Sequence, residues 1–207
     1  MNLKENKSEF NMNLPDIGVY SRPYFGERTN GDWAFVAQIN DFLFIAIIDG
    51  TGHGHNANKV TAIAKKTIKE QWSKDLNQTM KKLHEKLAKT LGAAIGLSIL
   101  NLKTLELEYL GVGNTICRKI GLNPISFFSV EGVVGVRMRD PNLQKTIIEH
   151  GDILLFYTDG INEGIDIKEI PNFAKQSASF TAKNIVKNFG SQFDDSTCIV
   201  IKFNYAN

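Results

Sequence analysis

The chain has 207 residues, a formal net charge of +2 and a composition that is 43% hydrophobic and 22% charged. This length suits one domain with its own core, and the composition is that of a folded globular protein rather than a disordered one. The small net charge, without an Arg-rich segment, argues against nucleic-acid binding. The longest apolar run, residues 42–48, is far shorter than the roughly 20 residues that span a bilayer, so we expect no membrane association.

Residues 1–15 are polar, rich in Asn and Lys, and lack the apolar segment of a signal peptide. We expect them to form a loose arm, and residues 16–207 to form a single domain, because no linker or repeat interrupts them. Cys117 and Cys198 form no CxxC pair, and two cysteines in a chain of this length do not predict a disulfide framework. Two reduced thiols and the missing signal peptide together favour a cytoplasmic protein.

Eight segments of the chain are predicted strands. Residues 42–48 form a continuous apolar run, which is typical of a strand buried on both faces. Residues 93–100 and 105–112 flank a short polar stretch, as the two strands of a hairpin do. The predicted strands are 33–38, 42–48, 93–100, 105–112, 115–120, 145–148, 153–157 and 197–203.

Three segments are predicted helices. Apolar residues recur at helical spacing over residues 60–72 and 76–87. A third helix is predicted at 181–189, with Thr181 as its N-cap and Gly190 as its C-terminal stop. Because strands and helices come in separate runs rather than alternating, the order indicates the α+β class and a layered sandwich with helices outside β-sheets.

Four acidic sites lie next to predicted strands. A carboxylate that follows a buried strand is costly unless it caps a turn or binds a cation, and clustered carboxylates repel one another unless a metal neutralises them. Oxygen ligands favour Mg²⁺ or Mn²⁺ over zinc. Asp-Gly is also a common turn dipeptide, so any one of these sites alone favours a plain turn, and the metal-site interpretation depends on all four together. The sites are Asp32, Asp49, Asp159 and the pair Asp194-Asp195.

A glycine-rich segment, Asp-Gly-Thr-Gly-His-Gly-His, occupies residues 49–55. Its alternating glycines would let the backbone approach an ion or a phosphate closely, or would simply form a flexible loop before a helix. The spacing matches neither a Walker loop nor a dinucleotide fingerprint. His53 and His55 could suggest zinc, but no further Cys or His cluster completes a zinc site. We expect His53 near the acidic sites and His55 at the surface or the helix start.

Five short motifs in order resemble those of the PPM-type metal-dependent serine/threonine protein phosphatases, in the bacterial branch typified by SpoIIE, RsbU and RsbX. They extend over nearly the whole chain, and the stand-alone domain is most similar to that of RsbX. The resemblance implies a four-layer α-β-β-α sandwich, in which helices flank two antiparallel β-sheets. The motifs are Asn-Gly-Asp at 30–32, Ile-Asp-Gly-Thr-Gly-His-Gly at 48–54, Gly-Val-Gly-Asn at 111–114, Tyr-Thr-Asp-Gly at 157–160 and Asp-Asp-Ser-Thr at 194–197.

The resemblance also implies a site with two divalent cations, Mn²⁺ or Mg²⁺, between the sheets. Asp49 matches the carboxylate that bridges both ions, and the Gly50 carbonyl matches a ligand of one of them. Asp159 and Asp194 match ligands of the other ion, and Asp32 matches an acidic position that often acts through water. Asp49 and Asp159 are therefore the central catalytic residues of the implied site. Neighbours with uncertain roles are Thr51, His53, Asn114 and Asp195, the last being the less favoured of the two adjacent acids.

The implied reaction is hydrolysis of a phosphate ester by a water that the two cations activate and orient. Two departures leave parts of the site open. Thr51 stands where the eukaryotic branch has a histidine that is its candidate general acid, so the proton donor is unassigned. Arg22 and Arg28 are candidates for a phosphate-binding arginine by position alone, and for each of them a surface arginine is the favoured interpretation.

By resemblance, the substrate is phosphoserine or phosphothreonine on a partner protein. The RsbX-like architecture points to a STAS-domain protein of the stressosome, or an anti-sigma-factor antagonist, in a bacterial stress-signalling pathway. The alternatives are a catalytically weak phosphatase-fold module that docks a phosphoprotein without turnover, and a different metal-dependent hydrolase built on the same residues.

Overall fold

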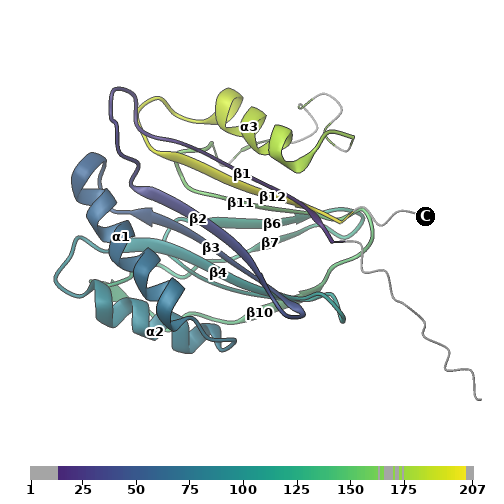
Figure 1. Cartoon of the computed structure of the whole chain (residues 1–207), viewed down its shortest axis with the longest axis horizontal. Coiled ribbons are helices and arrows are strands. Elements are labelled where there is room, and N and C mark those ends of the chain that lie inside the picture. The colour runs from purple at the N-terminus through teal and green to yellow at the C-terminus, as the bar shows by residue number, and fades with distance from the viewer. Residues whose placement is uncertain (1–13, 163, 166–169, 171–172, 174, 204–207) are drawn as a thin grey trace, which may run out of the picture.

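Two five-stranded antiparallel sheets lie face to face in the computed structural model, and helices cover their outer faces (Figure 1). The structure describes residues 14–162, 164–165, 170, 173 and 175–203. Most of the predicted arm, residues 1–13, therefore lies outside the described residues. Within the described part, no helix is long and apolar enough to cross a membrane.

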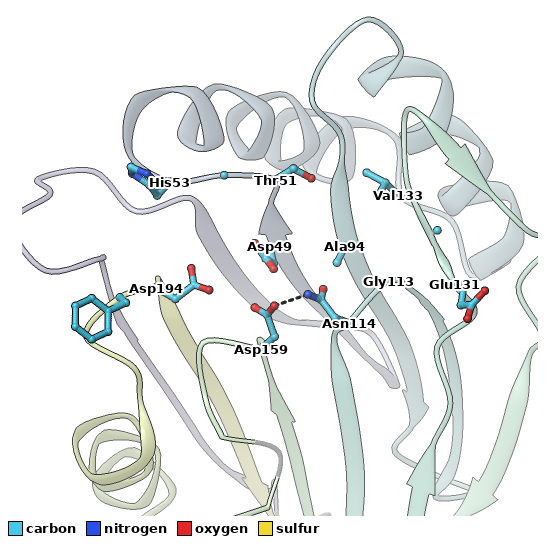
Figure 2. A pocket seen from close by; sticks show the side chains of 13 residues that line it. Asp49, Thr51, His53, Ala94, Gly113, Asn114, Glu131, Val133, Asp159 and Asp194 are labelled. Carbon is cyan, nitrogen blue, oxygen red and sulfur yellow. Dashed lines mark hydrogen bonds between the residues drawn. The ribbon is translucent and has the colours of Figure 1, made fainter.

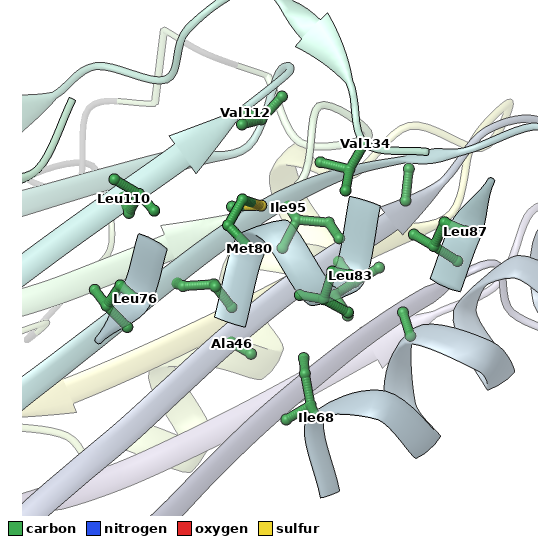
Figure 3. Close-up of a cluster of buried hydrophobic side chains, with 14 of the residues drawn as sticks. Ala46, Ile68, Leu76, Met80, Leu83, Leu87, Ile95, Leu110, Val112 and Val134 are labelled. Carbon is green, nitrogen blue, oxygen red and sulfur yellow. The ribbon is translucent and has the colours of Figure 1, made fainter. Parts of the chain in front are cut away.

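The first sheet is built around the most apolar segment of the chain. This segment forms β3 (Phe42–Gly50), which is buried on both faces, as the continuous apolar run predicts. Helices α1 (Gly54–Gln71) and α2 (Leu76–Leu87) pack on its outer face through a cluster of aliphatic side chains (Figure 3). The strands, in spatial order, are β10 (Gln144–Ile147), β5 (Glu106–Val112), β4 (Ala93–Asn101), β3 (Phe42–Gly50) and β2 (Asp32–Ile39).

The second sheet carries α3 (Ala178–Phe189) on its outer face, where Ile185 and Val186 pack against Leu155 and Val200. Its inner face meets the first sheet through a second apolar cluster that includes Ile45, Ile47, Leu154, Phe156 and Ile199. The strands, in spatial order, are β1 (Asp16–Arg22), β12 (Ser196–Lys202), β11 (Ile153–Tyr157), β6 (Ile116–Ile120) and β7 (Ile125–Phe127). A separate hairpin is formed by β8 (Gly132–Val133) and β9 (Arg137–Met138).

The predicted α+β class and the two antiparallel sheets are confirmed, and both cysteines are buried and free. One detail of the third helix is wrong. The helix begins at Ala178, and its N-cap is Ser177, whose Oγ accepts a hydrogen bond from the Phe180 backbone N–H at 3.3 Å. Thr181 lies one turn inside the helix and donates its hydroxyl to the Ser177 carbonyl. The prediction also missed β1, β7, β8 and β9.

Strand pairing brings the acidic sites to one edge of the two sheets. In the antiparallel register of β2 and β3, Asp32 lies opposite Asp49. In the second sheet, β11 ends beside the start of β6, with Tyr157 opposite Ile116, so the turn that contains Asn114 lies near the residues after β11. The start of β12 pairs with the end of β11. Residues that are distant in the sequence therefore meet at this edge.

Candidate active site

A pocket of about 710 Å³ opens at this edge, and Asp49, Asp159 and Asp194 are among the residues that line it. Figure 2 shows the carboxylates of Asp49 and Asp159 facing each other, with Asp194 beside them. Each comes from a different segment: Asp49 from the end of β3, Asp159 from the turn after β11, and Asp194 from the loop before β12. The pocket thus brings together three of the residues that the sequence predicted as metal ligands.

Asp49 is held in an environment that opposes its ionisation. Burial, which is the largest cause, raises the pKa of its carboxyl from 3.8 to about 9. The negative charges of Asp32, Asp159 and Asp194 contribute the next largest parts of this rise. Without a counter-charge, Asp49 therefore keeps its proton at neutral pH, and a bound cation would remove the cause of that preference.

Asp32 lies behind Asp49 and is 6% exposed. Burial raises the pKa of its carboxyl to about 7, against the opposing effect of hydrogen bonds from Thr158 and Thr197. The Thr158 hydroxyl donates to its Oδ2 at 2.7 Å, whereas its Oδ1 has no hydrogen-bond partner among the described residues. An unsatisfied, buried carboxylate oxygen is costly, and a water molecule or a cation would satisfy it.

Asp159 and Asp194 approach the pocket from the second sheet. The Asn114 side-chain N–H donates a hydrogen bond to Oδ2 of Asp159 and so orients this carboxylate (Figure 2). Burial and the charge of Asp159 raise the pKa of the Asp194 carboxyl. Its Oδ1 accepts a hydrogen bond from the Asp195 backbone N–H at 2.8 Å.

The neighbouring Asp195 does not line the pocket. Its carboxylate accepts two backbone hydrogen bonds of 2.9 Å, one from Tyr24 to Oδ1 and one from Gly31 to Oδ2. The carbonyl of Gly31 in turn accepts a hydrogen bond from the Gly50 N–H at 3.2 Å. Asp195 therefore ties the start of β12 to the segment before β2 and holds the Asp194 backbone in place.

The loop after Asp49 requires its glycines. A Cβ on the buried Gly50 would lie 2.6 Å from the Ala57 carbonyl oxygen and 2.7 Å from Oγ1 of Thr61, so no side chain fits there. Gly52 has a φ of +92°, a conformation that side chains disfavour. The Thr51 N–H donates to the Gly92 carbonyl at 3.0 Å, which ties the loop to the start of β4. Thr51 lines the pocket, but Gly50 is not among the lining residues.

His53 is the N-cap residue of α1 and lines the pocket, although its side chain makes no cap hydrogen bond. Its ring stacks on Tyr24 with a centroid separation of 4.9 Å, and its Nδ1 lies 3.5 Å from a carboxylate oxygen of Glu27. His55 lies in the first turn of α1 and is exposed. The two histidines of the H-x-H pair therefore have different surroundings.

The donor set fits a hard divalent cation. Three aspartates line one pocket, Asp32 lies behind them with an unpaired oxygen, and burial together with mutual repulsion raises carboxyl pKa values there. Among the described residues, no group of three or more His, Cys, Asp or Glu side chains is already drawn together around a metal-sized position.

None of the described residues that line the pocket is an arginine or a lysine. Arg22 donates a hydrogen bond to the Ser191 carbonyl at 2.6 Å, and Arg28 is exposed and is not among the lining residues. The β8–β9 hairpin instead places Arg137 and Arg139 in a smaller adjoining pocket, which shares Glu131 with the first. Neither of the two arginines that the sequence singled out therefore lines the first pocket.

The sequence model of the family described as Stage II sporulation protein E (SpoIIE) matches residues 40–204 of the chain. The chain belongs to the SpoIIE family. The phosphoserine phosphatase RsbX of Bacillus subtilis (strain 168) is 25% identical over 169 residues, which cover 76% of this chain and 84% of RsbX. The predicted membership of the SpoIIE/RsbX-like branch is thus confirmed.

Solved structures of the SpoIIE family share the fold. One, from work on the bacterial stressosome as a modular system adapted to control secondary messenger signaling, superposes with a TM-score of 0.85 at 25% identity, covering 91% of this chain and 99% of the other. The crystal structure of RsbX in complex with magnesium superposes with a TM-score of 0.81 at 21% identity, and the match covers 98% of this chain and 99% of the other. The PP2C phosphatase domain of SpoIIE from Bacillus subtilis superposes with a TM-score of 0.71 at 17% identity, and the match covers 93% of this chain and 64% of the other.

The pocket of this SpoIIE-family domain also contains residues that the sequence analysis did not single out. Glu131 and Val133 come from the segment around β8, and Phe193 precedes Asp194. Strands as short as β8 and β9 leave no periodic pattern in the sequence, which explains why this part was missed. Among these residues, Phe193 alone had a signal in the sequence, because it directly precedes the Asp-Asp pair.

Proposed function

We propose that this SpoIIE-family chain is an active, metal-dependent phosphatase that hydrolyses phosphoserine or phosphothreonine on a partner protein. The observation that carries the proposal is the meeting of Asp49, Asp159 and Asp194 at one pocket, with carboxyl pKa values raised by burial and mutual repulsion. Such a cluster is costly in the free protein, which is typical of a site shaped for a charged ligand.

In this proposal Asp49 and the Gly50 carbonyl would hold one divalent cation, and Asp49, Asp159 and Asp194 would hold a second. Bound Mn²⁺ or Mg²⁺ would supply a nucleophilic water and neutralise charge on the phosphoryl oxygens. Asp32 contributes its unpaired Oδ1 behind Asp49, directly or through water. The family relationship supports these roles, and the crystal structure of RsbX with magnesium supports the choice of a hard divalent cation.

The residues around the ligands have supporting roles. Asn114 fixes the orientation of Asp159 through its hydrogen bond, and Asp195 fixes the loop that carries Asp194. His53 lines the pocket and is our candidate for the group that protonates the departing serine oxygen. Stacking on Tyr24 holds its ring toward one side of the pocket.

The partner we propose is a STAS-domain protein of a stressosome, or an anti-sigma-factor antagonist, acting in a bacterial stress pathway in the cytoplasm. The similarity to RsbX and to the stressosome-related structure supports this choice. The competing function is a module that docks a phosphoprotein without turnover. No arginine or lysine is among the described lining residues, so in either function the charge of the phosphate would be balanced by bound cations rather than by a basic side chain.

Phosphate release from a phosphoserine-bearing STAS-domain protein distinguishes the two functions. We expect release with Mn²⁺, none with EDTA, and none with Asp159→Asn. Binding of the phosphoprotein by the wild type, measured by fluorescence anisotropy, without any release in the presence of Mn²⁺ would instead identify the docking module. A matched control is Asp140→Asn, which alters an exposed aspartate that is not among the lining residues and should release phosphate normally.

A further inference from the structure

Two phenylalanines at the site edge are exposed to solvent. Phe193 is 81% exposed and lines the pocket together with its neighbour Asp194. Phe25 is 78% exposed and follows Tyr24, the residue that stacks on His53. Figure 2 places Asp194 and His53 on one side of the pocket and Glu131 on the other, so both phenylalanines belong to the Asp194 side.

The backbone that carries both rings has defined hydrogen-bond partners. The Phe25 N–H donates to the Gln192 carbonyl at 3.1 Å, which joins the two segments. The Phe193 N–H donates to the Ser191 hydroxyl at 3.0 Å, and the Ser191 N–H donates to the Gly160 carbonyl at 2.7 Å. The segment with Phe193 is thereby anchored next to the turn that carries Asp159. The exposed rings are presented on a fixed backbone rather than on a free loop.

Single exposed apolar side chains are common on protein surfaces and do not mark a site by themselves. Leu122 is such a residue: it is 94% exposed and follows β6 at the end away from Asn114. Phe25 and Phe193 differ because they occur on joined segments beside a pocket that contains the carboxylates of Asp49, Asp159 and Asp194. The phosphate group of a substrate would occupy only the polar part of the pocket. The two phenylalanine rings can therefore contact only the parts of the substrate that extend beyond the phosphate.

We propose that Phe193, assisted by Phe25, forms a ledge that binds an apolar side chain next to the phosphorylated residue of the protein substrate. The inference rests on the proposed phosphatase function and names a specificity determinant for it. Aromatic rings are favoured as such contacts because they bury a large apolar area with few rotatable bonds. The ledge selects among phosphorylated segments, while the carboxylate cluster acts on the phosphate common to all of them.

The test compares two short fluorescein-labelled phosphoserine peptides, one with leucine and one with glycine on both sides of the phosphoserine. With the full chain and Mn²⁺, we expect kcat/KM to be about tenfold higher for the leucine peptide, mainly through KM. Phe193→Ala should bring the ratio close to one, whereas Phe193→Leu should keep most of it. The control Leu122→Ala, which removes an equally exposed apolar side chain elsewhere, should keep the wild-type ratio.

Anisotropy of the same peptides gives the ratio of their Kd values whether or not they are turned over. A wild type that does not distinguish the peptides, or a Phe193→Ala variant that keeps the wild-type ratio, overturns the ledge. Metal-dependent hydrolysis of p-nitrophenyl phosphate by the same preparations reports on the proposed phosphatase function separately. A leucine preference in binding without any hydrolysis would retain the ledge and contradict the phosphatase proposal.

Discussion

Replacement of Asp49 by asparagine should make the metal-free protein more stable, although it should abolish the proposed activity. Burial and three neighbouring carboxylates raise the pKa of the Asp49 carboxyl to about 9, whereas its ordinary value is 3.8. Between these pH values the unfolded state releases a proton that the folded state keeps. The stability of the wild type therefore falls as pH rises from about 4 toward 9, and asparagine, which is uncharged and of the same size, removes this dependence.

The magnitude follows from the two pKa values. Each pH unit above the ordinary pKa costs about 1.4 kcal/mol, so the effect at pH 7 has an upper limit of about 4 kcal/mol. The charges of Asp32, Asp159 and Asp194 contribute to the raised pKa of Asp49, and removing the Asp49 carboxyl also changes the pKa values of these neighbours. We therefore expect a gain of about 2–4 kcal/mol, which corresponds to roughly 5–15 °C in Tm for a chain of this length.

Thermal unfolding in EDTA, measured from pH 5 to pH 8.5 for the wild type and Asp49→Asn, gives this difference directly. The difference in Tm should grow as pH rises. With Mn²⁺ the difference in Tm between the variant and the wild type should shrink or change sign, because a ligand that binds only the folded wild type stabilises it. Asp140→Asn, at an exposed aspartate, should shift Tm by little at any pH. An Asp49→Asn variant that is no more stable than the wild type in EDTA would refute this electrostatic account of the site.

Three further predictions concern positioning, proton transfer and the core. Asn114→Ala should lower kcat about 10- to 100-fold with the circular dichroism spectrum unchanged, because Asp159 loses the hydrogen bond that orients it. His53→Ala should lower kcat much more for a phosphoserine peptide than for p-nitrophenyl phosphate, whose leaving group departs without a proton. Lys119→Met should reduce the free energy of unfolding in urea by about 3–5 kcal/mol, because it leaves the buried Asp152 carboxylate without its cation.

Each of these predictions has a clear contrary result. Full activity of Asn114→Ala would show that Asp159 needs no orientation, and equal loss on both substrates would show that His53 is not the proton donor. For the core, Lys103→Met is the matched control, because its ion pair with Asp41 is exposed and should contribute less than about 1 kcal/mol. Similar losses for the two lysine variants would contradict the distinction between buried and exposed pairs.

The sequence predicted the parts of the fold that local patterns determine. The apolar run of β3 and the periodic residues of α1 and α2 lie where they were expected. Strands of two or three residues, such as β8 and β9, contain no periodicity, so they were missed. Ser177 and Thr181 are both plausible caps in sequence, and a long-range contact accompanies the start at Ala178, whose N–H donates to the Asp16 carboxylate of β1 at 2.7 Å.

The candidate site was predictable in its composition but not in its arrangement. The order of the motifs along the chain indicated which aspartates belong to one site, because the strands next to them pair in a fixed register. The difference between Asp194 and Asp195 depends on contacts with residues about 160–170 positions away, since Tyr24 and Gly31 occupy both oxygens of Asp195. No local pattern contains that information, and the same holds for the exposed ring of Phe193 at the pocket edge.

Hydrolysis of p-nitrophenyl phosphate by the full chain, titrated with Mn²⁺ and compared with Asp49→Asn, tests the central claim most directly. The account predicts that wild-type turnover rises to saturation with Mn²⁺, is abolished by EDTA, and falls by more than roughly 100-fold in the variant, because the cations contribute several kcal/mol to the reaction. Turnover that does not depend on the metal, or that is equal in Asp49→Asn, would contradict it.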